Sequence, residues 1–156
     1  MNENLIILSV FILCIVLIAF LYRNATLEKL SSLPDEHTLF EEDGIAVEQT
    51  GTPRMAYYGK CKIRLTNKRL IIAQKMLFTS NWYMLRFVIT FSNYAPSPDL
   101  KTSIKMGYYI SNTEKNKISF KQDNELTKIS IPVSKRWTIH FTTRSGSDYM
   151  KIIEKV

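Results

Sequence analysis

The chain has 156 residues, enough for one folded domain with an additional segment but not for a second core of ordinary size. Its net charge of +7 is unevenly spread, because residues 1–48 carry two basic and eight acidic side chains whereas residues 49–156 carry 19 basic and six acidic ones. Two cysteines, Cys14 and Cys61, are too few for a disulfide framework, and the cationic distal part favours anionic partners.

An apolar stretch of eighteen residues without a charge runs from Leu5 to Tyr22. As a helix it would extend roughly 27 Å, close to the thickness of the bilayer hydrocarbon, which predicts a transmembrane anchor over residues 1–23. The leader before it lacks Lys and Arg, which favours an uncleaved anchor over the alternative, a cleaved signal peptide. Arg23 and Lys29 follow the stretch, so the positive-inside rule predicts a single-pass membrane protein with a cytoplasmic C-terminal domain.

Residues 24–44 form a polar, acidic segment that we predict to be a linker. Within it, Pro34 followed by Asp35 and Glu36 suits the first turn of a short helix, because proline tolerates that position and acidic residues suit the positive end of the helix dipole. Two interpretations of the acidic charges are open. The segment is either a solvated linker or a strap that folds back over the basic part of the chain and blocks it.

From residue 45 onward the sequence is a succession of short apolar-alternating runs separated by turn residues, with a loop at Asn93–Pro98. At the end the period changes to that of a helix through Tyr149, Ile152, Ile153 and Val156. The domain over residues 45–156 is therefore predicted to be mainly β, a small barrel or sandwich closed by a C-terminal helix. The predicted strands, antiparallel throughout, are Ile45–Thr50, Ala56–Thr66, Arg69–Lys75, Trp82–Phe91, Ser103–Ser111, Lys117–Lys121, Leu126–Ile131 and Trp137–Thr142.

The stretch from Gly59 to Lys75 is predicted to be a hairpin with a cationic outer face. Lys60, Lys62 and Arg64 fall on one side of its first strand, and the residues between them are apolar. Each of these cations would gain up to about 1 kcal/mol near anionic lipid head groups. An ordinary solvated strand face is the alternative interpretation.

The same hairpin resembles a known family. Tyr58-Gly59 followed by Leu65-Thr-Asn-Lys-Arg-Leu-Ile-Ile72 is similar to the signature of GRAM and bacterial pleckstrin-homology-like domains, and Ile129-Ser-Ile-Pro132 and the terminal helix also fit that superfamily. The resemblance covers about residues 41 to 156. It implies a partly open barrel of about seven strands capped by a C-terminal helix, a fold that binds and does not catalyse.

Some members of this superfamily bind phosphoinositides with basic residues of the first two strands and their loop. The resemblance implies that Lys62-Ile-Arg64 is the matching element and that Arg54 lies in the corresponding loop, whereas Glu48 stands in the first strand where a lysine would be expected. The predicted lipid- or anion-binding residues are Arg54, Lys60, Lys62, Arg64, Lys68 and Arg69.

Catalytic, metal and cofactor motifs are absent from the sequence. His37, His140 and Cys61 lack the spacing of metal ligands, and none of the five glycines forms a phosphate-binding loop. No nucleophile is accompanied by a recognisable base and acid. We therefore expect no enzyme, no metal and no cofactor.

These patterns together predict a membrane-anchored, pleckstrin-homology-like binding or assembly module at the cytoplasmic membrane face, with the bilayer and anionic lipids as partners. The alternative is a protein-interaction or oligomerisation domain that recruits a partner to the membrane and binds no lipid ligand. Nucleic acid is not an expected partner, because the predicted anchor argues against it and the basic residues are spread over many strands.

Overall fold

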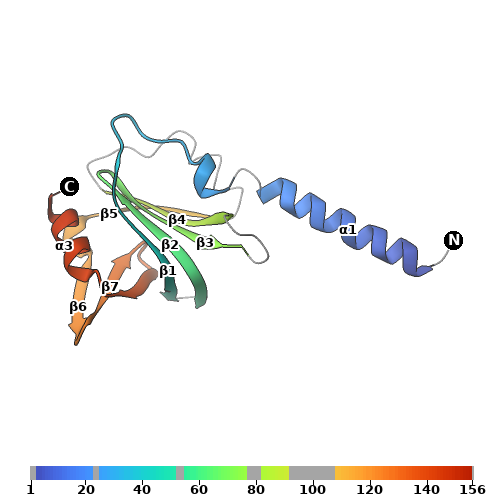
Figure 1. Cartoon of the computed structure of the whole chain (residues 1–156). Helices are drawn as coiled ribbons and strands as arrows, with labels where there is room; N and C mark the ends of the chain where they lie inside the picture. The colour runs from blue at the N-terminus through green and yellow to red at the C-terminus, as the bar shows by residue number, and fades with distance from the viewer. Residues whose placement is uncertain (1–2, 23–24, 52–54, 77–81, 92–107, 156) are drawn as a thin grey trace.

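The computed structural model describes residues 3–22, 25–51, 55–76, 82–91 and 108–155 (Figure 1). The predicted loop Asn93–Pro98 and much of the predicted strand Ser103–Ser111 lie outside these residues. The elements are α1 (Glu3–Tyr22), η1 (Leu27–Lys29), β1 (Thr38–Gly51), β2 (Ala56–Thr66), β3 (Arg69–Lys75), β4 (Tyr83–Phe91), β5 (Tyr109–Thr113), η3 (Lys115–Lys117), β6 (Ser119–Asp123), β7 (Leu126–Pro132), β8 (Trp137–Thr143) and α3 (Gly146–Lys155).

A single eight-stranded sheet forms the domain, in the order β5-β4-β3-β2-β1-β8-β7-β6. It curls into a half-barrel with α3 beside β6 and β7 (Figure 1). The prediction of a mainly β domain with a C-terminal helix is confirmed, with eight strands as the residue pattern predicted, against about seven implied by the family resemblance. The prediction of antiparallel pairing throughout was wrong for one pair, because β4 and β5 run parallel.

The long strand β1 joins the two halves of the sheet, because it pairs with β2 from Thr38 to Gln49 and with β8 from Val47 to Gly51. Irregular positions bend the β1–β2 pair, and two residues with positive φ lie in them, Gly44 (φ 80°) and Lys60 (φ 52°). Such bulges interrupt the alternation of apolar and polar residues. That is why the sequence pattern predicted β1 only from residue 45 onward, seven residues after its start.

The inner face of the half-barrel holds the main core, which takes apolar side chains from β1 to β4, β7 and β8. Helix α3 closes this core with Tyr149 and Ile153, both buried. The Tyr149 ring meets the rings of Phe40 and Phe141 edge-on, at centroid distances of 4.9 and 5.4 Å. Burying one such large apolar side chain stabilises the fold by about 1.5–3 kcal/mol, which explains why the predicted helix docks there.

A second apolar cluster lies on the outer face of β3 and β4. Segment 25–30 covers this face, so β4 is buried on both sides, although the alternation of apolar residues in such a strand indicates only one buried face. The cluster consists of Ala25, Leu27, Ile71, Ala73, Tyr83, Leu85, Val88 and Tyr108.

The acidic segment 24–44 is not an extended solvated linker in its described part. It contains the short helix η1, a turn at Pro34 and Asp35, and the first half of β1. The predicted helix starting at Pro34 does not form, because Asp35 adopts a φ of 54°, which an α-helix of L-residues does not tolerate.

The predicted transmembrane anchor over residues 1–23 is contradicted. Within the described part of the chain, no helix has both the length and the apolar character that a bilayer crossing requires. The same finding contradicts the predicted single-pass membrane localisation and the orientation derived from it.

Candidate functional site: the basic hairpin and the connector clasp

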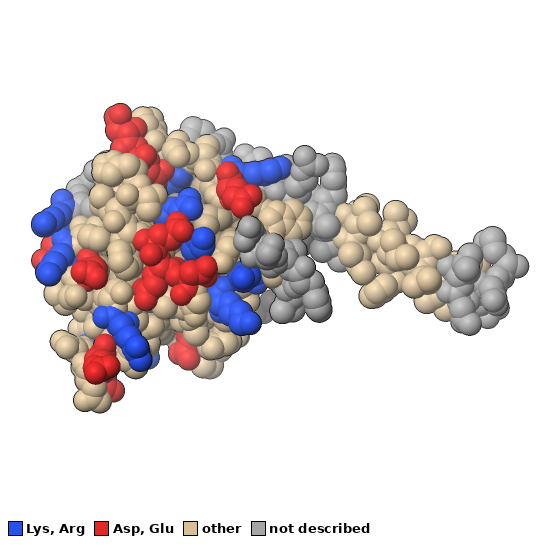
Figure 2. Space-filling view, in the orientation of Figure 1, with Lys and Arg blue, Asp and Glu red and all other residues tan. Residues whose placement is uncertain are grey.

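The six basic residues predicted to bind lipid do not form one surface. Arg54 lies outside the described residues, and Lys60 is exposed at the bulge of β2. Lys62 and Arg64 do share the outer face of β2 as predicted, while Arg69 is buried beside the β2–β3 turn. Figure 2 shows acidic side chains in the middle of the visible face with basic ones around them, so this face is not uniformly cationic.

Lys62 and Arg64 are both paired with one carboxylate, Glu41 on the neighbouring strand. The Lys62 Nζ and Arg64 Nε atoms lie 3.2 and 2.6 Å from its two oxygens. Burial alone would raise the pKa of Glu41, but the hydrogen bond and charge of Arg64, assisted by Lys62, outweigh it and lower that pKa. The Lys62 ammonium also lies 4.5 Å from the centre of the Tyr83 ring. Both cations are therefore engaged within the domain.

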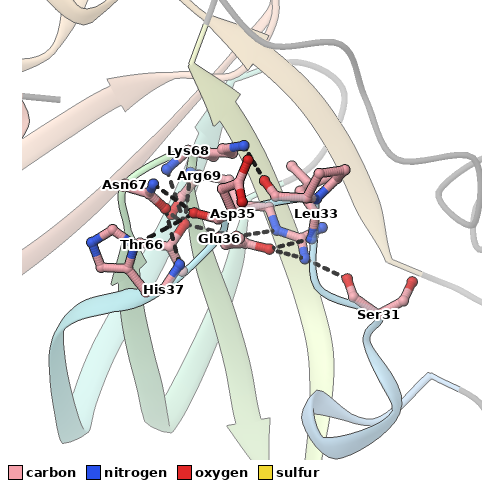
Figure 3. Close-up of polar contacts among 10 residues, drawn as sticks. Ser31, Leu33, Asp35, Glu36, His37, Thr66, Asn67, Lys68 and Arg69 are labelled. Carbon is pink, nitrogen blue, oxygen red and sulfur yellow. Dashed lines mark hydrogen bonds and ion pairs between the residues drawn. The ribbon is translucent and has the colours of Figure 1, made fainter.

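Arg69 forms a buried, bidentate ion pair with Glu36, the centre of what we call the connector clasp (Figure 3). We use the name connector for the acidic segment 24–44. The clasp comprises the contacts between residues 31–37 of the connector and the β2–β3 turn, residues 66–69. Arg69 Nε and Nη2 donate to the two carboxylate oxygens of Glu36, each at 2.7 Å, and Nη2 also donates to the Ser31 carbonyl at 2.6 Å. The side chains of Arg69 and Glu36 are only 1% and 4% exposed.

Glu36 is held in its charged form by further donors. The Thr66 hydroxyl donates to one carboxylate oxygen at 2.7 Å and the Leu33 amide to the other at 2.8 Å. Burial by itself would raise the pKa of Glu36, but the bonds from Arg69, Leu33 and Thr66 outweigh it and lower the pKa. A bidentate, charge-assisted pair with these additional donors orders both segments that supply it.

The other two residues of the turn also bind the connector. Asn67 accepts the His37 amide hydrogen at 3.1 Å and donates from its own amide side chain to the Asp35 carbonyl at 3.0 Å. Lys68 donates from Nζ to the Pro34 carbonyl. Each residue of the string Thr66-Asn-Lys-Arg69, which carries the family resemblance, thus contacts residues 31–37 (Figure 3).

Upstream of the clasp, the connector docks on β4 as a short strand does. The Leu85 amide donates to the Ala25 carbonyl at 2.8 Å, and Thr26 forms a β-bridge with Met84. Leu27 is 5% exposed and packs in the outer cluster. Backbone pairing, the buried Leu27 side chain and an ion pair together hold residues 25–37 on the sheet.

Sequence reasoning missed Glu36, Thr66 and Asn67 as parts of this site. The signal that could have found them is the opposite charge of the acidic connector and the basic hairpin. The interpretation of the connector as a strap that folds back is the one that agrees with the pairing of Glu36 with Arg69 and of Glu41 with Arg64.

Groups capable of acid–base or nucleophilic chemistry are dispersed. His140 lies between the hydroxyls of Thr50 and Ser130, each 2.8 Å from a ring nitrogen, and burial followed by the charge of Lys128 lowers its pKa. Burial raises the pKa of the Cys61 thiol to about 12, so this thiol is not a reactive thiolate. Among the described residues, no three His, Cys, Asp or Glu side chains are grouped closely enough to hold a metal ion.

Comparison of the chain with models of protein families gave no match, and comparison with curated proteins gave none either.

Proposed function

We propose that the chain is a non-catalytic, pleckstrin-homology-like binding module that recognises a protein segment through a strand-like backbone contact, an apolar side chain and a carboxylate. Its half-barrel with a C-terminal helix agrees with the resemblance of the hairpin to that superfamily. The receptor surface is the outer face of β3 and β4 together with the β2–β3 turn.

The observation that carries this proposal is the way in which residues 25–37 are bound. Backbone pairing with a strand, combined with pockets for particular side chains, is a common mode of peptide recognition. Here Thr26 supplies the bridge, Leu27 the apolar contact and Glu36 the charge. The segment of the same chain is the resident ligand, and a partner segment of similar chemistry would compete with it.

Within the described part of the chain, the resident segment leaves two buried polar groups without hydrogen bonds, which favours its replacement by a partner segment. The Thr26 hydroxyl and Arg69 Nη1 are buried and have no hydrogen-bond partner among the described residues. Leaving such a group unpaired costs about 1–3 kcal/mol. A partner segment that supplied an acceptor to Arg69 Nη1 would bind the same surface more tightly.

The test uses the full chain and a fluorescent synthetic peptide of residues 25–37. The substitution Glu36→Ala in the chain removes the carboxylate from the resident segment and leaves Arg69 unpaired. We expect the peptide to bind this variant at least about tenfold more tightly than the unaltered chain and to raise its Tm, because the peptide restores a charge-assisted pair.

Two controls make the result specific. The chain variant Glu28→Ala removes an exposed carboxylate of the same segment and should leave peptide affinity unchanged. A peptide with Ala in place of Glu36 should neither bind nor raise the Tm. If the original peptide binds no variant of the chain, the proposal is wrong.

Anionic head groups are the alternative ligand, and the exposed position of Lys60 favours them. The pairing of Lys62 and Arg64 with Glu41 favours the protein ligand. Vesicle co-sedimentation separates the two. Binding to anionic but not to neutral vesicles would support the hypothesis that lipid head groups are the ligand, provided that salt and the double substitution Lys62→Glu with Arg64→Glu weaken it. We expect neither the binding nor the effect of these substitutions.

A further inference from the structure

The half-barrel has a seam where β5 faces the turn between β7 and β8. In this seam, side chains of β5 bind backbone carbonyls of the turn. Thr113 Oγ1 donates to the Pro132 carbonyl at 2.6 Å, and the Ser111 hydroxyl donates to the Val133 carbonyl. The Tyr109 and Trp137 rings meet edge-on nearby, at a centroid distance of 4.7 Å. Side-chain contacts therefore close the seam in this region.

A hollow of about 400 Å³ lies along this seam, between residues 112–117 and residues 132–135. We call it the seam hollow. Its volume falls within the range of roughly 300–1,000 Å³ that small-molecule sites occupy in proteins. Pro132 and Val133 give it an apolar wall, and Asn112, Ser134, Lys117 and Lys135 give it polar groups.

The charges that line the seam hollow favour an anion. Lys117 is paired with Glu114, with 3.0 Å between Nζ and Oε1, and both side chains are more than half exposed. Lys135 forms no ion pair with any acidic side chain of the described residues. Two lysines and one glutamate line the hollow, so its lining has a net positive charge. The lysine that has no acidic partner in the described part of the chain, Lys135, lies on the β7–β8 side.

Ser134 adds an oriented donor beside Lys135. Its Oγ atom accepts the amide hydrogens of Arg136 and Trp137, both at 3.1 Å. Because these two bonds occupy the acceptor positions of the hydroxyl, its hydrogen is available for donation to a ligand. A hydroxyl donor, an ammonium group and a side-chain amide that line the same hollow are a suitable set for an oxyanion.

We infer that the seam hollow is a binding site for a small organic oxyanion, a carboxylate or a phosphate ester with an apolar part. Lys135 and Ser134 bind the oxyanion, Asn112 and Lys117 line the opposite side, and the apolar part of the ligand packs on Pro132 and Val133. This site shares no residue with the receptor surface proposed for the partner segment. The two proposals therefore stand or fall separately.

The test is a titration of the ¹⁵N-labelled full chain, followed by amide chemical shifts. The probes are phenyl phosphate and benzoate, which distinguish the two oxyanions, and inorganic phosphate, which lacks the apolar part. We expect phenyl phosphate or benzoate to shift the amides of Asn112, Ser134 and Lys135 at millimolar concentration, with inorganic phosphate binding more weakly.

Lys135→Ala should weaken binding by at least about tenfold, the loss expected for a hydrogen bond to a charged group. Lys135→Arg should retain most of the affinity. Lys151→Ala removes an exposed lysine of α3 and is the matched control, which should bind as the unaltered chain does. Absence of shifts with both organic probes, or equal affinity in Lys135→Ala, would overturn the inference.

Discussion

At the scale of single residues, the pair of Arg69 and Glu36 determines how the connector is held. Both side chains are almost fully buried, where an unpaired charge is costly to desolvate. Lys62 and Arg64, in contrast, are partly exposed and share Glu41. The sequence does not distinguish the two sets of ion pairs. The buried pair contributes more to stability, because solvent screens the partly exposed pairs.

The substitution Arg69→Ala should therefore destabilise the domain by roughly 3–5 kcal/mol, since it leaves Glu36 buried without its charge partner. The measurement is the free energy of unfolding in urea. Lys117→Ala is the control, because its pair with Glu114 is exposed and contributes at most about 1 kcal/mol. A similar loss of unfolding free energy in both variants would contradict the expected contribution of the buried pair to stability.

Acid should weaken the same pair. The pKa of Glu36 is lower in the folded chain than its ordinary value of 4.5, so the stabilisation is fully present above pH 4.5 and is lost as the pH falls through the folded-state pKa. We expect the unfolding free energy of the unaltered chain to fall more steeply below pH 4.5 than that of Glu36→Gln. Parallel pH profiles would show that Glu36 titrates normally.

At the scale of elements, helix α3 depends on a close approach at its first residue. A Cβ atom on Gly146 would lie 2.1 Å from Thr127 Oγ1 and 2.2 Å from Thr127 Cβ, too close for either residue to keep its place. Glycine is thus required where the start of α3 crosses β7. Helix α3 then brings Tyr149 against Phe40 and Phe141.

Gly146→Ala should destabilise the domain by about 1–3 kcal/mol, the usual cost of overpacking, and should loosen the docking of α3. Gly59→Ala is the matched control, because its Cβ would meet its nearest neighbour at an ordinary 3.7 Å. Thermal unfolding of both variants, with amide hydrogen exchange in α3, gives the comparison. Equal Tm values for the two variants would contradict this account.

At the scale of the whole molecule, α1 projects away from the half-barrel (Figure 1). Its described apolar side chains between Ile6 and Leu17 are exposed around the helix. An exposed apolar surface of this kind promotes association in water.

We expect the full chain to form assemblies larger than a monomer in aqueous buffer. Leu13→Lys with Leu17→Lys should reduce them, because charged groups resist burial between helices. Size-exclusion chromatography with light scattering measures the effect. Met55→Lys, which alters an exposed apolar residue outside α1, should leave assembly unchanged. A monomeric unaltered chain would refute the expectation.

The fold was predictable from the sequence wherever a local pattern was sufficient. The alternation of Cys61, Ile63 and Leu65 with cations identified β2, because side chains of a strand alternate between faces. The spacing of Tyr149 and Ile153 identified α3 for the corresponding reason in a helix. The start of β1 and the parallel pairing of β5 were not predictable, since neither a bulge nor the direction of a partner strand leaves a periodic signal.

The sequence by itself determined that this chain is a mainly β, cationic domain with a terminal helix and an acidic segment before it. Only the tertiary structure decided which charges meet. Glu36 and Arg69 are 33 residues apart, and Glu41 and Arg64 are 23 apart, so their pairing depends on strand register and on the turn at Asp35. Charge pairing across such distances follows from the fold as a whole, which no local pattern specifies.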